Sequence, residues 1–138
     1  MQLSSAIPVR GLIIRPEPLE KILSGKKTLE LRSRSNQIRG EIALIRKSSG
    51  HIVGVAQIGD SVGPMEFAEF ASRANEHGVE QNRLQEVFDS GYTTGWKLSN
   101  IRRLRTSVPY LHKAGAVTWV MLDEMAVAGL QLALSSGS

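Results

Sequence analysis

The sequence predicts an α+β protein: a mixed β-barrel of about five or six strands, with a helix after the first strand and a helical insertion in the middle. Short runs of aliphatic and β-branched residues recur along the chain, which is typical of strands. Helical patterns interrupt them near the start and in the middle, without the regular alternation of a doubly wound parallel sheet. With 138 residues and ordinary apolar content, one domain with a real core is expected.

The first three elements follow from residues near the N-terminus. A compact apolar run predicts a short buried strand over Arg10–Arg15. The stretch PEPLEKILSG predicts a helix, because its prolines suit the entry and Gly25 is placed to end it. The alternation in TLELR predicts a strand whose leucines point to the core, whereas Thr28, Glu30 and Arg32 point the other way.

The remaining elements complete the barrel. Two strand-like runs within residues 41–58 predict a hairpin. Gly54 in its second strand indicates a bend or the close approach of another backbone segment. Apolar residues at helical spacing predict two short helices within residues 65–91. Strands are expected from Thr94 onward and over Ala116–Leu122. The domain is expected to cover residues 10–122, followed by a tail, 123–138, that is a short helix or partly disordered.

The composition and the apolar segments indicate the cellular compartment in which the protein is expected. Cysteine is absent, which excludes disulfides and cysteine-ligated metal sites and fits a reducing compartment. The N-terminus lacks the basic start and apolar run of a secretory signal, and the longest apolar stretch, Met125–Leu134, is too short to span a bilayer. A soluble cytoplasmic protein without a membrane partner is therefore expected.

No motif for a cofactor or a metal stands out. The chain has neither a phosphate-binding glycine loop of standard spacing nor a G-x-S-x-G element. His51, His77 and His112 lie far apart, so no metal site and no cofactor are predicted. His77 follows Glu76 at a helix end, where an exposed capping position is expected.

Charge is distributed unevenly along the chain, although the total is only +4. Residues 10–47 carry ten Lys/Arg against four Glu, and residues 92–113 carry five bases and no acid. Residues 60–89 carry seven acids against two arginines. If the fold joins the two basic segments, they form a positive face suited to a polyanion. The alternatives are an ordinary solvated surface and a protein-binding role for the acidic insertion.

The stretch GLIIRPEPLEKILSGKKTLELRSR resembles the N-terminal signature of the ASCH domain family: a strand ending in Arg-Pro, a helix, Gly-x-Lys-Thr, and a strand with Glu and Arg. The resemblance continues through IVGVAQIGD and the Trp-containing segment to the last strand, over residues 10–122. It implies a small barrel similar to the RNA-binding PUA domain, with a cleft between the barrel and the helix before Gly-x-Lys-Thr. The family includes nucleic-acid-binding proteins, a branch that deacetylates 4-acetylcytidine, and members that cut RNA.

The resemblance also indicates candidate catalytic residues. Lys27 matches the family's lysine, as a base with lowered pKa or as a cation that holds an oxyanion. Glu30 stands where deacetylating members carry a second threonine; a carboxylate there can act as a base for water or accept from the amino edge of a cytosine-like base. Glu76 is the nearest match to that branch's glutamate. Lys27→Ala is expected to leave melting nearly unchanged while reducing binding or turnover.

The wider candidate site combines cleft residues with a basic patch. Tyr92 and Tyr110 are candidates for base stacking, whereas Trp96 and Trp119 are expected in the core or at the barrel rim. Glu30 and Arg32 can equally form a structural ion pair, and the arginine cluster can be an edge that blocks strand pairing. The predicted ligand-binding residues are Arg15, Lys26, Lys27, Thr28, Glu30, Arg32, Tyr92 and Tyr110. The predicted nucleic-acid patch is Arg34, Arg102, Arg103 and Arg105.

These observations predict an RNA- or nucleoside-binding ASCH-type domain with a basic cleft next to the barrel. Its expected partner is RNA or a nucleoside ligand. The alternative is a small hydrolase that uses the same cleft, either a 4-acetylcytidine amidohydrolase or a metal-independent ribonuclease.

Overall fold

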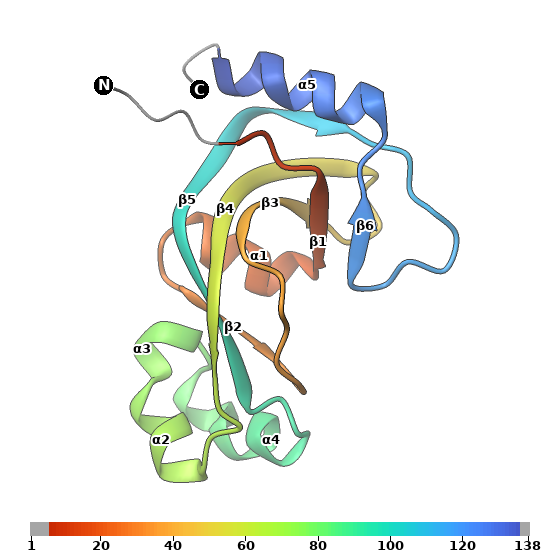
Figure 1. The fold of residues 1–138 in the computed structure, drawn as a ribbon. Coiled ribbons are helices and arrows are strands. Elements are labelled where there is room, and N and C mark those ends of the chain that lie inside the picture. The colour runs from red at the N-terminus through yellow and green to blue at the C-terminus, as the bar shows by residue number, and fades with distance from the viewer. Residues whose placement is uncertain (1–5, 136–138) are drawn as a thin grey trace.

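The protein forms a single six-stranded sheet with the strand order β2-β5-β4-β3-β1-β6 (Figure 1). The computed structural model describes residues 6–135. The strands are β1 (Arg10–Ile14), β2 (Leu29–Arg32), β3 (Gly40–Arg46), β4 (His51–Val62), β5 (Thr94–Pro109) and β6 (Trp119–Met121). The helices are α1 (Pro16–Leu23), α2 (Phe67–Ser72), α3 (Ala74–His77), the 3-10 helix η1 (Gln81–Arg83), α4 (Leu84–Asp89) and α5 (Glu124–Ser135).

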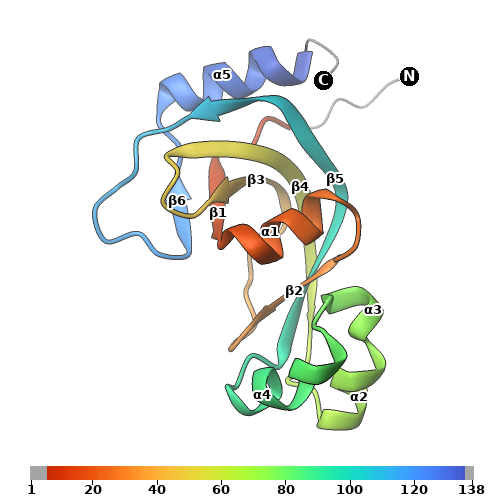
Figure 2. The same cartoon turned by 180° about the vertical axis from the view of Figure 1, so that it is seen from behind.

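The sheet is mixed and curls into a half-barrel, which confirms the predicted fold class. Strands β1 and β3 are parallel, and the other neighbours are antiparallel. The helices between β4 and β5, which are α2, α3, η1 and α4, form the insertion. The long strands β4 and β5 curve from α5 at one end to the insertion at the other, as both views show (Figures 1 and 2). Helix α1 lies across the sheet between these ends (Figure 2). Because β2 and β6 are the two edges, the barrel stays open between them.

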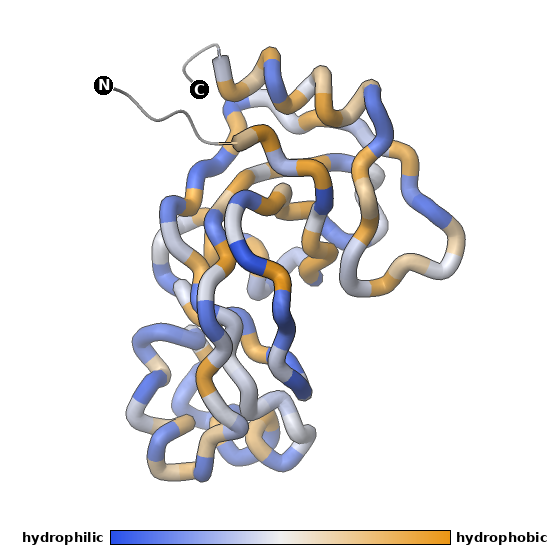
Figure 3. The backbone as a smooth tube through the Cα atoms, viewed as in Figure 1, coloured by the Kyte–Doolittle hydropathy of each residue, from blue (hydrophilic) through white to orange (hydrophobic). Residues whose placement is uncertain are grey.

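The central strands are buried on both faces, which explains their continuous apolar runs. Leu12 and Ile14 of β1 belong to the cluster that includes α1, whereas Ile13 belongs to the cluster that includes α5. Hydrophobic segments accordingly follow these strands, and the insertion is more mixed (Figure 3). Leu29 and Leu31 are buried as expected, but in a third cluster formed with the insertion.

The last strand is shorter than the sequence predicts. Only Trp119–Met121 pairs with β1, whereas a strand over Ala116–Leu122 was expected. The apolar pattern misleads at the start of that segment, because Val117 lies in the preceding loop with 76% of its surface exposed.

The C-terminal segment forms helix α5, which covers one end of the sheet. Asp123 begins the helix: its carboxylate accepts from the amides of Ala126 at 3.2 Å and Leu111 at 2.8 Å. These bonds, led by that of Leu111, lower the pKa of Asp123. Leu130 is fully buried against the sheet. No helix among the described residues is long and apolar enough to cross a membrane.

Gly54 in β4 provides a test of the sheet packing. A Cβ there would lie 2.9 Å from the Arg102 carbonyl oxygen and 2.7 Å from Leu23 Cδ2, in keeping with the close approach expected from sequence. Gly54→Ala should lower the free energy of unfolding by about 1–3 kcal/mol, measured by urea denaturation, because overpacking forces the backbone to shift. Gly59→Ala in the same strand is the control, since its nearest atom is the Lys97 carbonyl oxygen at 3.9 Å. Equal stability of the two variants would contradict this packing.

Candidate functional site

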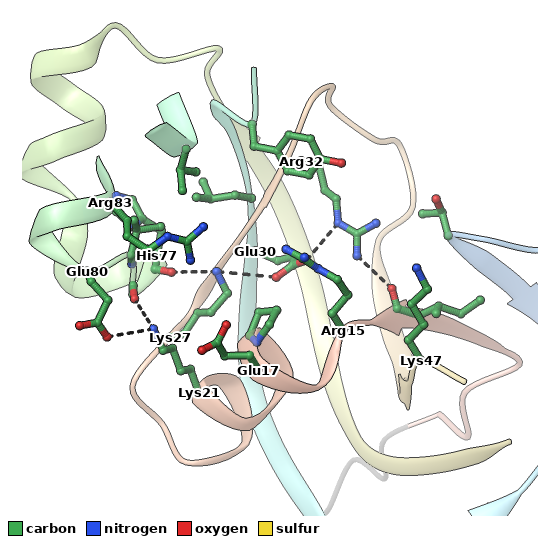
Figure 4. Close-up of a pocket in the computed structure, with 18 of the residues that line it drawn as sticks. Arg15, Glu17, Lys21, Lys27, Glu30, Arg32, Lys47, His77, Glu80 and Arg83 are labelled. Carbon is green, nitrogen blue, oxygen red and sulfur yellow. Dashed lines mark hydrogen bonds and ion pairs between the residues drawn. The ribbon is translucent and has the colours of Figure 1, made fainter. Parts of the chain in front are cut away.

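A pocket of about 450 Å³ opens between the start of α1, strand β2, the insertion and the loop before β6 (Figure 4). Its wall carries six basic and three acidic side chains, so its formal charge is +3. The charged residues of the wall are Arg15, Glu17, Lys21, Lys27, Glu30, Arg32, Lys47, Glu80 and Arg83.

Lys27 is buried at the base of this pocket, with 4% of its surface exposed. Its Nζ donates to the carbonyl oxygens of Leu29 at 3.0 Å and His77 at 2.8 Å. The remaining side of the ammonium faces Glu30 Oε1 at 3.7 Å. Burial lowers the pKa of Lys27, although the Glu30 carboxylate opposes this effect. Lys27 is therefore a fixed buried charge that joins β2 to the insertion.

Glu30 places a carboxylate between two cations, and one of its oxygens accepts no hydrogen bond from any described residue. Its Oε2 accepts from Arg32 Nε at 3.0 Å, so the ion pair that was one alternative from sequence is present. Arg32 also donates to the Ile13 carbonyl at 3.1 Å and lies 5.2 Å from the centre of the Trp96 ring. Glu30 Oε1 is buried and has no hydrogen-bond partner. The residue is 5% exposed and lines the pocket, whereas Oε1 itself is enclosed by its neighbours.

His77 is buried, so the expectation of an exposed capping residue was wrong. Its Nε2–H donates to the Phe70 carbonyl at 2.7 Å, and its Nδ1 accepts from the Val79 amide at 3.1 Å. The ring stacks on Phe70 with centroids 4.5 Å apart. Burial lowers the pKa of His77, which keeps the ring neutral beside Lys27. The one sequence feature that indicates the contact between His77 and Phe70 is their spacing of seven residues.

Lys21 forms a second tie between α1 and the insertion. Its Nζ donates to the Gly78 carbonyl at 2.8 Å and pairs with Glu80 at 3.4 Å. Sequence reasoning did not single out Lys21, because these partners lie 57 and 59 residues away. Together, Lys21 and Lys27 fix the loop at Gly78 against the helix and so define one wall of the pocket.

The structure brings together five of the residues singled out from sequence. Arg15, Lys27, Glu30, Arg32 and Tyr92 all line the pocket. Tyr92 is the one aromatic residue among these five, with 46% of its surface accessible. Trp96 is 3% exposed and stacks on Trp119 at 6.0 Å, which confirms the expectation that these rings belong to the core and rim.

Other candidates lie outside this pocket. Lys26 is exposed and does not line it, and Thr28 and Glu76 border a second, smaller hollow. Glu76 pairs with Arg73 at 3.0 Å, away from the pocket of Lys27. Tyr110 is only 8% exposed, because it packs in the core cluster that includes α5. Its position beside Pro109 suggested a loop, and β5 does end at that proline, but the ring is buried all the same.

Two arginines of the predicted patch contact different helices. Arg103 pairs with Glu20 of α1 at 2.6 Å, whereas its neighbour Arg102 donates to the Leu134 carbonyl of α5 at 3.5 Å. The two side chains therefore serve different helices. Arg34 and Arg105 are exposed, and the nucleic-acid role of the four arginines stays a prediction.

Comparison with known proteins identifies the family. The family model of the ASCH domain matches residues 12–106, which is more than half of the chain. The chain belongs to the ASCH domain family. This family is associated with nucleic acids in general and is generally thought to bind RNA. No curated protein matches the chain.

The ASCH fold is also found in solved structures. Three crystal structures of ASCH from Zymomonas mobilis match at 18% identity: a serine-to-alanine mutant, the protein itself and a tyrosine-to-phenylalanine mutant. Their TM-scores are 0.65, 0.62 and 0.65. The matches cover 96%, 93% and 93% of this chain and 98%, 94% and 96% of the respective relatives. At this identity they show a shared fold.

Because Lys27 is buried, truncation of its side chain is now expected to destabilise the protein and not to leave melting unchanged. Lys27→Met should lower the free energy of unfolding by about 3 kcal/mol, because two buried carbonyls lose a donor and Glu30 loses a cation. Lys26→Met is the matched control, since Lys26 is exposed. Urea denaturation of both variants is the measurement, and equal stabilities would refute a structural role for the Lys27 ammonium.

His77 should make stability depend on pH. Because burial lowers its pKa in the folded state, the unfolded chain binds this proton more readily. The contribution of the neutral ring is fully present above pH 6.5 and is lost as the pH falls through the lowered pKa. His77→Asn should be less stable near neutrality and show a flatter decline below pH 6.5. His51→Asn, at an exposed position, should keep the wild-type profile in denaturation at a series of pH values.

Proposed function

We propose that this ASCH domain binds RNA or a nucleoside, and that the pocket at Glu30 receives a nucleobase. The observation that carries the proposal is Oε1 of Glu30, a buried carboxylate oxygen that accepts no hydrogen bond among the described residues. It belongs to a pocket whose wall has a net positive charge, and a small rotation of the side chain would present it to a ligand. A buried acceptor without a donor is unfavourable by about 1–3 kcal/mol, and a ligand N–H group would remove that penalty. Membership of a family generally thought to bind RNA supports the same ligand class.

The chemistry of the acceptor favours bases with an exocyclic amino group. A carboxylate accepts hydrogen bonds, and the amino groups of cytosine and adenine are donors on their recognition edges. Arg32 pairs with Oε2 of this carboxylate and Lys27 faces Oε1, so the position of both oxygens is fixed. The same edge of uracil carries a carbonyl oxygen, which the carboxylate would repel.

The remaining wall suits a base and its sugar-phosphate. Tyr92 offers an exposed ring for stacking, an interaction that every base can make. A volume of about 450 Å³ lies in the range of small-molecule sites. The net positive charge of the wall favours a ligand that carries phosphate.

A hydrolase that uses this pocket is the second candidate, and the same free oxygen favours it. Glu30 Oε1 would take a proton from a water that attacks the acyl carbon, while the Lys27 and Arg32 cations would stabilise negative charge on the acyl oxygen. The acyl C–N bond would then break, and Glu30 would return the proton to the leaving amino nitrogen. In this scheme Lys27 acts as a cation and not as a base, because two of its protons are already donated to carbonyls. Glu76 has no part in it.

Replacement of the free acceptor tests the base-binding proposal. The full chain should bind cytidine more tightly than uridine in NMR or calorimetric titrations. Glu30→Gln should reduce this preference about tenfold, since a charge-assisted hydrogen bond is lost. Glu41→Gln, a partly buried position in β3 outside the pocket, is the control. Absence of nucleoside binding, or equal losses for cytidine and uridine in Glu30→Gln, would reject the proposal.

The hydrolase candidate has its own readout. The wild-type chain is incubated with 4-acetylcytidine, and the products are followed by mass spectrometry. Turnover by wild type that disappears in Glu30→Gln and persists in Glu41→Gln would favour hydrolysis over simple binding. Binding of cytidine without turnover would favour the binding function.

A further inference from the structure

Two cations on one side of the pocket have no partner. Within residues 6–135, the side chains of Arg15 and Lys47 make neither an ion pair nor a hydrogen bond, although both line the pocket. On the insertion side, by contrast, Lys21 pairs with Glu80 at 3.4 Å, and Arg83 pairs with an acidic side chain of α4 at the same distance. The uncompensated positive charge of the wall therefore lies on the side of Arg15 and Lys47.

The topology places these two residues side by side. Arg15 directly follows β1, and Lys47 directly follows β3, which is the parallel neighbour of β1. The Lys47 amide donates to the Ile14 carbonyl at 2.9 Å, so the pairing continues to the ends of both strands. Adjacent strands are about 4.8 Å apart, so the two side chains start from neighbouring points where β1 and β3 end. In Figure 4 both lie on the strand side of the pocket, near Arg32.

The helix that begins here adds little to anion binding. Pro16 and Pro18 occupy the first and third positions of α1, so two of its first three backbone N–H donors are missing. Between them, Glu17 adds a negative charge. An anion on this side of the pocket would therefore be held by the Arg15 and Lys47 side chains.

We propose that Arg15 and Lys47 form a phosphate subsite, so that the ligand of the pocket is a nucleotide and not a free nucleoside. This inference rests on the proposed base site at Glu30. Arginine can hold phosphate with two parallel hydrogen bonds, and lysine adds a mobile point charge. Arg32 connects the two parts of the site, because it bonds both Glu30 and the carbonyl of Ile13, two residues before Arg15. The phosphate can belong to a mononucleotide or to the backbone of an RNA strand.

The test compares ligands that differ only in phosphate. The full chain is titrated with cytidine, 3′- and 5′-cytidine monophosphate and a short single-stranded oligocytidylate RNA at low salt. The phosphorylated ligand should bind at least about tenfold more tightly than cytidine. Arg15→Gln/Lys47→Gln should bring this ratio close to one and leave cytidine affinity unchanged. Lys97→Gln/Lys113→Gln removes the same charge from exposed positions outside the pocket and should keep the ratio.

Each outcome separates the subsite from the base site. Equal affinity for cytidine and all phosphorylated probes, or a preference that survives Arg15→Gln/Lys47→Gln, overturns the phosphate subsite and leaves the base site standing. Failure of every probe to bind overturns both. Tight binding of a monophosphate assigns the subsite to a phosphomonoester, whereas a preference for the oligonucleotide alone assigns it to a phosphodiester. If binding depends on phosphate but its affinity is unchanged in Glu30→Gln, the subsite is supported and the base site is rejected.

Discussion

The buried ammonium of Lys27 connects the parts of this protein that build the pocket. It bonds the Leu29 carbonyl in β2 and the His77 carbonyl at the end of α3, and it faces the Glu30 carboxylate. An unpaired charge at this depth would be unfavourable by several kcal/mol, so the strand, the insertion and the carboxylate keep their places together. His77 contributes by staying neutral, because a second positive charge beside Lys27 would oppose the same contacts. The site is thus fixed by the folding of the insertion onto α1 and β2.

The open barrel explains why the polar side of β2 is available to a ligand. Strand β2 is an edge strand, and its two leucines are committed to the hydrophobic cluster of the insertion. Strand alternation then turns Glu30 and Arg32 to the other side. Arg32 is fixed in turn by the Ile13 carbonyl and the face of Trp96. Polar side chains on a strand usually face bulk solvent, but here they are held at a pocket by contacts with two other strands, β1 and β5, and with Lys27.

Local pattern was sufficient for most of the fold and for the centre of the site. The apolar runs of β1 and β3 predict buried strands because both faces are covered, and the alternation of β2 separates its leucines from Glu30 and Arg32. Lys21 and Lys47 were missed, because their roles depend on segments that meet only in the folded chain. The burial of Tyr110 was missed for a related reason: the residue does lie in the connection after β5, but its ring packs in the cluster that includes α5.

Two irregularities of the pocket complement each other. Glu30 leaves a buried acceptor unsatisfied, and Arg15 with Lys47 leaves positive charge uncompensated on the neighbouring side. The buried acceptor lowers the stability of the folded chain. Arg15 and Lys47 are exposed to solvent, so they remain available to an anion at little cost. Departures of this kind concentrate at functional sites, where a ligand supplies the missing partner. A ligand with an N–H donor at one end and an anion at the other would satisfy both at once, and a nucleotide has this distribution of groups.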